Sequence, residues 1–171
     1  MQDRFLAIVG KVLTTANVLN WVCVVVFALV LLWSYPFAPI VLGQLATKYT
    51  TQPVVPILNA MRLMIVLGLL VAYPVHVILT RLRAILATAQ AGDPFVVANA
   101  RRLQAVGWAL LTIQLLDVLF GIITISLAVR HVDTTGWVPS VSGWIAVLMV
   151  FVLARVFTIG TRMRDDLEMT V

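Results

Sequence analysis

Charged residues and cysteine are scarce in this chain of 171 residues. Charged residues make up 11% of it and hydrophobic residues 62%, whereas soluble domains are about a quarter charged and about half apolar. A globule of this size cannot bury so much apolar surface in water, which excludes a soluble enzyme and a disordered chain. The single cysteine, Cys23, excludes an internal disulfide and a thiolate metal cluster. The composition therefore places the chain in a lipid bilayer.

Recognisable motifs for catalysis or cofactor binding are also lacking. The sequence contains no G-x-S-x-G, no H-E-x-x-H and no glycine-rich phosphate loop. His131 and Asp133 form an H-x-D pair, which falls short of the three or four ligands of a zinc site. The excess of twelve Lys and Arg over seven Asp and Glu is typical of the cytoplasmic loops of membrane proteins. We therefore predict a protein that is not an enzyme, that has no metal or cofactor, and that does not bind nucleic acid directly.

Four segments are long and apolar enough to cross a bilayer, for which a helix needs about 20 mostly apolar residues. They cover approximately residues 18–35, 57–79, 106–129 and 141–158. No removable signal peptide is evident before the first of them, because Lys11 interrupts the apolar run. The sequence predicts an all-α integral membrane bundle of four transmembrane helices, with residues 1–171 as a single domain.

Basic residues are distributed unequally between the two sides of these spans. Only Lys48 and Arg130 fall on the side that carries the loops after the first and third spans. Because basic loops stay in the cytoplasm, both termini and the loop between the second and third spans are predicted to be cytoplasmic. The basic residues on that side are Arg4, Lys11, Arg81, Arg83, Arg101, Arg102, Arg162 and Arg164.

The segment between the second and third spans predicts a helical hairpin that extends them into the cytoplasm. Good helix formers follow the second span, and Gly92 suits the left-handed position just past a helix end. Asp93 is expected to cap the next helix and Pro94 to occupy its first turn. That helix then continues directly into the third span.

Aromatic residues mark the opposite side of the predicted bundle. Trp33 and Tyr35 end the first span, and Trp137 and Trp144 flank the start of the fourth. Trp and Tyr are enriched at membrane interfaces, where one end of the ring is apolar and the other wet. The four residues are therefore expected to form an interfacial belt.

Two stretches resemble a bacterial membrane family catalogued as domain of unknown function 2975. Its members have four spans, a central G-D-P-F followed by N-A-R-R-L, and an acidic tail that ends in Thr-Val or Thr-Ile. The resemblance implies no established activity, but it implies the bacterial inner membrane and a small helix-turn-helix regulator as a neighbour and partner. Val97 and Ala98 depart from the Pro-Glu that members often carry. The matching residues are Gly92, Asp93, Pro94, Phe95, Asn99, Ala100, Arg101, Arg102 and Leu103, with the tail from 153 to 171.

Asp117 is the most conspicuous residue inside a predicted span. An ionisable group there costs about 2.5–3.5 kcal/mol by insertion scales, so it is expected to face other helices, a partner or water. Arg62 and Arg155 are placed by the predicted spans within about two helical turns of its depth, and either is expected to pair with it. Gln114 lies three residues earlier on nearly the same helix face. These four residues predict an intramembrane polar cluster, structural or functional.

Three functions are compatible with these features. The first is a regulatory or scaffolding membrane protein that binds a cytoplasmic protein. The second is a subunit of an oligomeric transporter of ions or small solutes that uses the Asp117 cluster, since four spans leave one protomer little room for a pore. The third is a structural subunit of a larger membrane complex. For the first, the expected partner-binding residues are Asp93, Pro94, Phe95, Asn99, Arg101, Arg102, Arg164, Asp165, Asp166 and Glu168.

Overall fold

The computed structural model describes residues 2–134 and 136–168, with no account of the side chains at 2, 3, 5 and 164–168. All secondary structure in this part of the chain is helical. Four of the helices are long and apolar enough to cross a membrane, which confirms the predicted fold class and makes the chain a multi-pass membrane protein. The helices are α1 (Gln2–Trp33), α2 (Ala38–Lys48), α3 (Val54–Gln90), α4 (Val97–Ala128) and α5 (Val141–Glu168).

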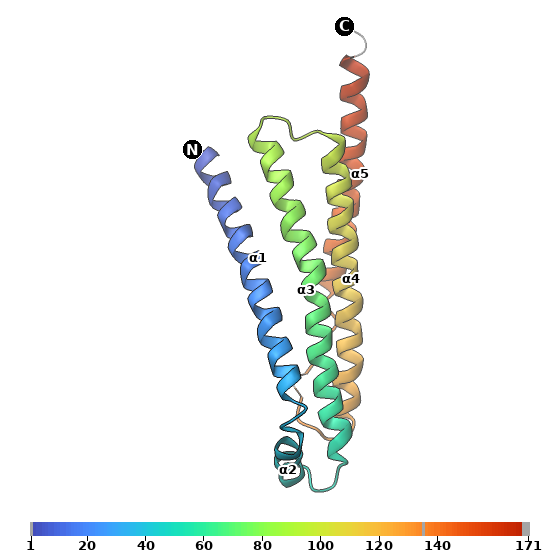
Figure 1. Ribbon diagram of the computed structural model, residues 1–171. Helices are drawn as coiled ribbons and strands as arrows, with labels where there is room; N and C mark the ends of the chain where they lie inside the picture. Colours follow the sequence, from blue (N-terminus) through green and yellow to red (C-terminus); the bar gives the residue numbers. More distant parts are fainter. Residues whose placement is uncertain (1, 135, 169–171) are drawn as a thin grey trace.

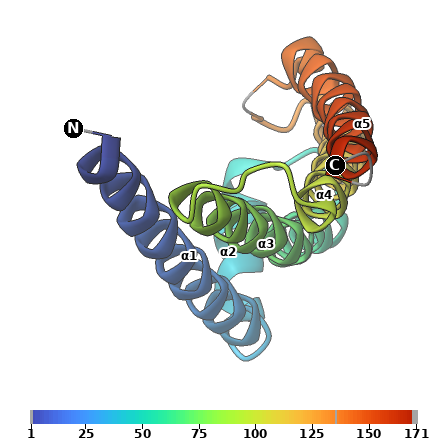
Figure 2. The ribbon, with the colours of Figure 1, turned by 90° about the horizontal axis from the view of Figure 1, so that it is seen from above.

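The four long helices lie side by side in the order α1, α3, α4 and α5 (Figure 1). Seen along the helices, they form one curved layer (Figure 2). Among the described residues, α1 packs closely only on α3, and α5 packs closely only on α4. The bundle is therefore an open row with two free edges, formed by α1 and α5.

The two ends of the row differ. At one end the chain turns from α3 into α4, and there α1 also begins and α5 ends (Figure 1). The short helix α2 lies at the opposite end, where it packs on α3. We call these the hairpin end and the α2 end. The segment between α1 and α3 thus contains a short helix, which ends at Lys48 before a turn.

The helices are longer than the predicted spans because hydropathy marks only the apolar part of a helix. Helix α3 runs on to Gln90, past the basic residues that end its apolar run. Helix α1 ends at Trp33, three residues before Pro36, which has no N–H to continue the helical hydrogen bonds. The hairpin extension of α3 and α4 is thereby observed.

The turn of the hairpin follows the prediction at one residue and departs from it at another. Gly92 has a φ of +83°, the left-handed conformation expected past a helix end. Helix α4, however, begins only at Val97, after Val96, and no side chain caps it. The prediction that Asp93 caps α4 with Pro94 in its first turn is therefore wrong, because Phe95 and the extended Val96 separate Pro94 from the helix.

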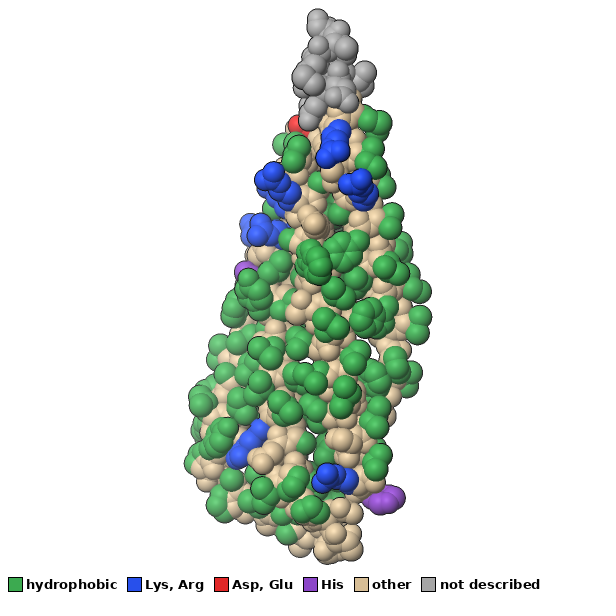
Figure 3. Space-filling model, turned by 90° about the vertical axis from the view of Figure 1, so that its right-hand side faces the viewer, with side chains coloured by type: hydrophobic (Ala, Val, Ile, Leu, Met, Phe, Trp, Pro, Cys, Tyr) green, Lys and Arg blue, Asp and Glu red, His purple; other side chains and the backbone are tan. Residues whose placement is uncertain are grey.

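A buried hydrophobic cluster lies toward the α2 end, where α3 and α4 meet the segment that follows α4. It consists of Ile57, Leu67, Ile123, Leu127 and Val132. Further buried hydrophobic residues lie on α4 toward the hairpin end, among them Ala100, Leu103 and Val106. Elsewhere the surface is largely hydrophobic along the middle of the molecule, and Lys and Arg lie toward its ends (Figure 3). This pattern is expected of helices whose outer surface faces lipid, because burial inside protein is not required of apolar residues there.

Helix α5 is displaced along the row toward the hairpin end. After α4 ends at Ala128, residues 129–140 turn back, and α5 starts beside the middle of α4. The Nε2 amide of Gln114 donates to the carbonyl of Ser140 at 3.3 Å, just before α5 begins. Gln114 precedes the end of α4 by about 20 Å at 1.5 Å per residue. The same displacement carries the other end of α5 past the hairpin turn (Figure 1).

Candidate functional site

Asp117 lies in the middle of α4 and is paired with a tryptophan. Its Oδ1 accepts a hydrogen bond from Nε1 of Trp137 at 3.3 Å. The indole ring of Trp137 lies against Gly121, one turn further along the same face, so closely that any β-carbon there would collide with it. Trp137 is therefore not part of an interfacial belt. The segment that follows α4 and turns back along it, which we call the returning segment, places Trp137 beside Asp117 in the middle of α4.

Gln114 joins α4 to α5 beside this pair. Its side chain is buried and packs directly on Gly143 in the first turn of α5, where a β-carbon would collide with the amide. Ser140 accepts from Gln114 through its carbonyl and from the N–H of Gly143 through its Oγ. These bonds give hydrogen-bond partners to the carbonyl of Ser140 and the N–H of Gly143 at the start of α5. The end of a helix inside a membrane needs such partners because no water is present there.

Arg62 belongs to a different group of residues. Its guanidinium donates from Nη2 to the carbonyl of Ser34 at 2.6 Å and from Nε to Oγ of Ser34 at 3.0 Å. It also lies 4.2 Å from the ring centroid of Tyr35. A cation at the end of α1 satisfies carbonyls that have no helical partner. The predicted pairing of Arg62 with Asp117 is therefore wrong, because Arg62 binds the end of α1.

Arg155 does not reach Asp117 either. It is exposed on α5 between Phe151 and Phe157. Both of these residues pack on the hairpin side of Asp117. Phe151 packs 3.0 Å from the β-carbon position of Gly107, and Phe157 stacks on Phe95. The predicted pairing of Arg155 with Asp117 fails because α5 starts beside the middle of α4, not at its end. Within the described residues, Asp117 forms no ion pair.

Asn99 holds the hairpin together and has no exposed surface. Its Nδ2 donates to Oγ1 of Thr88 at 2.7 Å and to the carbonyl of Pro94 at 2.8 Å. Its Oδ1 accepts from Nη1 of Arg102 at 2.8 Å, and Arg102 also donates to the carbonyl of Ala84 at 3.2 Å. Asn99 and Arg102 therefore link the two arms of the hairpin, and Asn99 is not accessible to a partner.

Phe95 connects the hairpin turn to α5. Its ring stacks on Phe157 with centroids 5.3 Å apart, and it also lies against Gly160. Phe95 is still 47% exposed, so part of its ring faces outward. This contact fixes where α5 passes the hairpin.

The remaining expected partner-binding residues fall into two groups. Arg101 is exposed at the start of α4, and Asp93 and Pro94 lie in the turn between the arms. The side chains of the acidic tail lie outside the described residues, although its backbone continues α5 as helix to Glu168. Their predicted part in partner binding therefore concerns side chains that the structure does not describe. These residues are Arg164, Asp165, Asp166 and Glu168.

One face of α5 is apolar, exposed and turned away from α4. Four residues at helical spacing form it, and we call them the α5 stripe: Val152, Val156, Ile159 and Met163. Ile159 is 46% exposed and Met163 58% exposed, and both follow Phe157, which already lies at the hairpin turn. Arg155 and Arg162 are exposed beside the stripe, seven residues apart. The predicted fourth span, 141–158, includes Val152 and Val156 but not Ile159 and Met163. No local sequence pattern shows that these last two residues lie beyond the hairpin turn.

The α2 end carries the one ion pair among the described residues. Nζ of Lys48 lies 2.9 Å from Oδ2 of Asp133, and both side chains are exposed. The hydrogen bond with Asp133 raises the pKa of Lys48, and the bond with Lys48 lowers the pKa of Asp133. The N–H of Asp133 also donates to the Tyr49 hydroxyl at 3.2 Å. These contacts attach the returning segment to α2. Among the described residues, no group of three or more His, Cys, Asp or Glu side chains could hold a metal ion.

Comparison with known proteins gives a family and nothing more specific. The family model described as protein of unknown function (DUF2975) matches residues 41–171. No curated protein and no solved structure matches the chain. The matched range includes α3, α4 and α5 entirely, whereas α1 lies before it.

Proposed function

We propose that this chain, which belongs to the DUF2975 family, is a non-catalytic regulator of the bacterial inner membrane that docks a cytoplasmic protein at its hairpin end. The charge distribution supports this orientation, because basic residues accumulate on the cytoplasmic side of membrane proteins. Lys48 and Arg130 lie toward the α2 end. The exposed basic residues toward the hairpin end are Arg4, Lys11, Arg81, Arg83, Arg101, Arg155 and Arg162.

The α5 stripe is the observation that carries the proposal. Phe157 stacks on Phe95 at the hairpin turn, beyond Arg101 and Arg102 along α4. Met163 follows Phe157 by about 9 Å at 1.5 Å per residue. In the proposed orientation this part of the stripe stands in water, where exposed apolar residues at helical spacing are typical of a helix-binding surface.

The stripe and its neighbours define the partner's chemistry. An amphipathic helix would cover the stripe with its apolar face, and acidic residues about seven positions apart would meet Arg155 and Arg162. The small helix-turn-helix regulator implied by the family resemblance is the proposed source of that helix. Binding would hold the regulator at the membrane, away from its DNA, so that the membrane protein controls its availability.

Photo-crosslinking from single positions tests this proposal. A benzophenone amino acid at Ile159 is expected to yield an adduct with one soluble protein, identified by mass spectrometry as a regulator with a helix of this type. The same group at Leu148 is the matched control, because Leu148 is also exposed on α5, even more than Ile159, but lies nearer the start of the helix. Reversal of both Arg155 and Arg162 to Glu should abolish the adduct, while Arg130→Glu should keep it. Adducts from Ile159 with lipid or with the chain itself only would refute docking at the stripe.

A transport function has one observation in its favour. Asp117 lines an apolar groove of about 510 Å³ between α1, α3 and α4, together with Phe27 and Gly68. The absence of Arg62 and Arg155 from that site weakens the proposal of a charged pathway. Reconstituted protein in which Asp117→Asn abolishes the flux of an ion or solute would favour transport over docking.

A further inference from the structure

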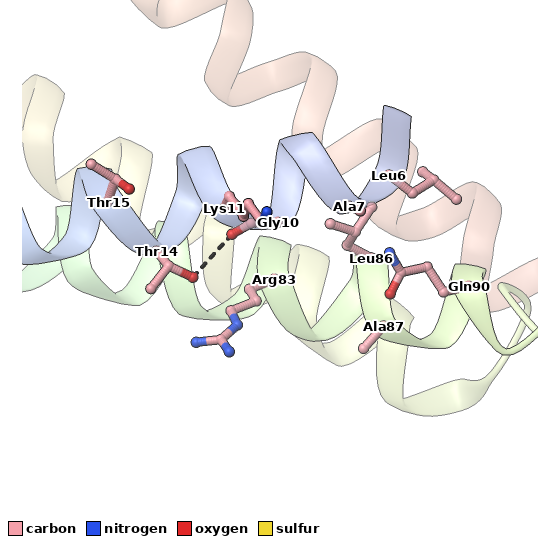
Figure 4. A pocket seen from close by; sticks show the side chains of 10 residues that line it. All are labelled: Leu6, Ala7, Gly10, Lys11, Thr14, Thr15, Arg83, Leu86, Ala87 and Gln90. Carbon is pink, nitrogen blue, oxygen red and sulfur yellow. Dashed lines mark hydrogen bonds between the residues drawn. The ribbon is translucent and has the colours of Figure 1, made fainter. Parts of the chain in front are cut away.

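A cleft of about 640 Å³ separates α1 from α3 at the hairpin end. The two helices diverge toward this end (Figure 1). Figure 4 shows that the lining side chains come from the first half of α1 and the last turns of α3. They are Leu6, Ala7, Gly10, Lys11, Thr14, Thr15, Arg83, Leu86, Ala87 and Gln90.

The divergence follows from how α1 is attached. Asn20 donates from Nδ2 to the carbonyl of Ala72 at 3.0 Å, and Asn17 is hydrogen-bonded to Nδ1 of His76 at 2.8 Å. Toward the hairpin end from Asn17, the structure gives no hydrogen bond between α1 and α3 among the described residues. There the side chain of Leu86 lies 3.5 Å from the β-carbon position of Gly10. The gap therefore stays open to a molecule that enters sideways from the bilayer.

The cleft combines an apolar floor with a basic rim. Leu6, Ala7 and Leu86 provide apolar surface between the helices. Lys11 from α1 and Arg83 from α3 are both exposed at the edge, and Figure 4 shows the Arg83 guanidinium extending away from the helices on the side of Thr14. None of the residues that line the cleft is acidic. The charge therefore favours an anion whose attached part is apolar.

We propose that this cleft binds an anionic phospholipid of the inner leaflet. The phosphate would lie between Lys11 and Arg83, and an acyl chain would cover Leu86 and the neighbouring alanines. Basic pockets between membrane helices on the cytoplasmic side are typical sites for such head groups. The proposal rests on the orientation given under the proposed function but not on the docking of a partner at α5.

Native mass spectrometry of the full chain tests the site. Protein from nanodiscs that contain equal amounts of phosphatidylglycerol and phosphatidylcholine is expected to retain phosphatidylglycerol. The double variant Lys11→Gln with Arg83→Gln should retain it at least about tenfold less, since each basic residue contributes to the attraction of anionic lipid. Arg81→Gln with Arg101→Gln is the matched control, because both arginines are exposed near this end but outside the cleft. The control should retain lipid like the unchanged chain.

Three results would overturn the proposal. Equal retention of the two lipids would show that the head-group charge is not recognised. Unchanged retention by the double cleft variant, or an equal loss in the control, would place the lipid elsewhere. Displacement of the lipid by millimolar inorganic phosphate would mean that the site recognises phosphate without an acyl chain. The measurement requires no partner, so its failure is distinguishable from failure of the Ile159 cross-link.

Discussion

The two edges of the helix row are attached to its centre in different ways. Helix α1 is joined to α3 by polar side chains: Asn17 and Asn20 bind α3, and Arg62 of α3 binds the end of α1. Helix α5 is joined to α4 through glycines, with Phe151 on Gly107 and Gln114 on Gly143. Both are known solutions to membrane packing, where apolar burial gives no driving force between helices.

The difference indicates which part of the molecule is the more rigid. None of the apolar window of α1 is buried, whereas α4 is the helix with the most buried residues. The family model begins at residue 41, after α1. We infer that α3, α4 and α5 form the common unit, and that α1 is attached to it through α3 alone.

The largest effect is expected from Gly121→Ala. The added methyl group would occupy the position of the Trp137 ring and would displace the hydrogen bond to Asp117. Overpacking of this kind costs about 1–3 kcal/mol. Thermal unfolding in detergent should show a clearly lowered Tm. Gly43→Ala is the control, because its β-carbon would meet nothing within 4 Å, and equal stability of the two variants would contradict the glycine-based packing.

A smaller loss is expected from Asn99→Ala. The substitution removes the hydrogen bonds that Asn99 makes with Thr88, Arg102 and the carbonyl of Pro94. Unsatisfied buried polar groups cost about 1–3 kcal/mol, and some of that is recovered if water enters. Hydrogen exchange should rise in residues 84–102 first. The exposed Asn59→Ala serves as the control, and unchanged exchange in the hairpin would show that Asn99 does not hold it together.

Arg62→Met is expected to loosen α1 without unfolding the rest. It removes both hydrogen bonds to Ser34 and the contact with Tyr35, at a cost of about 1 kcal/mol for interhelical polar contacts in membranes. Spin-label distances between α1 and α3 should broaden, while distances between α4 and α5 remain sharp. If both pairs broaden together, the two edges are not independent.

The smallest effect is expected at the exposed pair of Lys48 and Asp133. The pKa of Asp133 is lowered, so its contribution is present above the ordinary pKa of 3.8 and is lost as the pH falls through the lowered value. The pKa of Lys48 is raised, so its contribution is present below 10.5 and is lost as the pH rises through the raised value. Asp133→Asn should therefore change the Tm slightly and equally from pH 5 to pH 9. A pH-dependent difference within that range would contradict this account.

Sequence patterns predicted the existence of the long helices but not their relative positions. Length and apolarity identify a span directly, and Gly92 marks the hairpin turn by its backbone conformation. The offset of α5 depends on a loop that returns along α4, and no local pattern specifies such a path. The wrong prediction that Arg155 pairs with Asp117 follows from this displacement of α5 alone.

The candidate site could be predicted only in part, for a related reason. Asp117 is conspicuous because of its charge, but its partner Trp137 looks like an ordinary interfacial tryptophan. The signal that was available is the spacing of Asp117 and Gly121, one turn apart, which leaves room for a ring beside a carboxylate. Asn99 was expected to bind a partner because it follows a turn. In the structure it is fully buried, and three hydrogen bonds satisfy its amide.

The most direct test of the proposed docking surface is the side of the membrane on which Ile159 meets water. Ile159→Cys in a chain with Cys23→Ala would be treated with a membrane-impermeant maleimide in inverted vesicles and in intact spheroplasts, with Leu148→Cys as the control. The account predicts rapid labelling of position 159 in inverted vesicles, none in spheroplasts, and little labelling of position 148 in either. Labelling of position 159 in spheroplasts, or protection from the reagent on both sides in the absence of any partner, would contradict it.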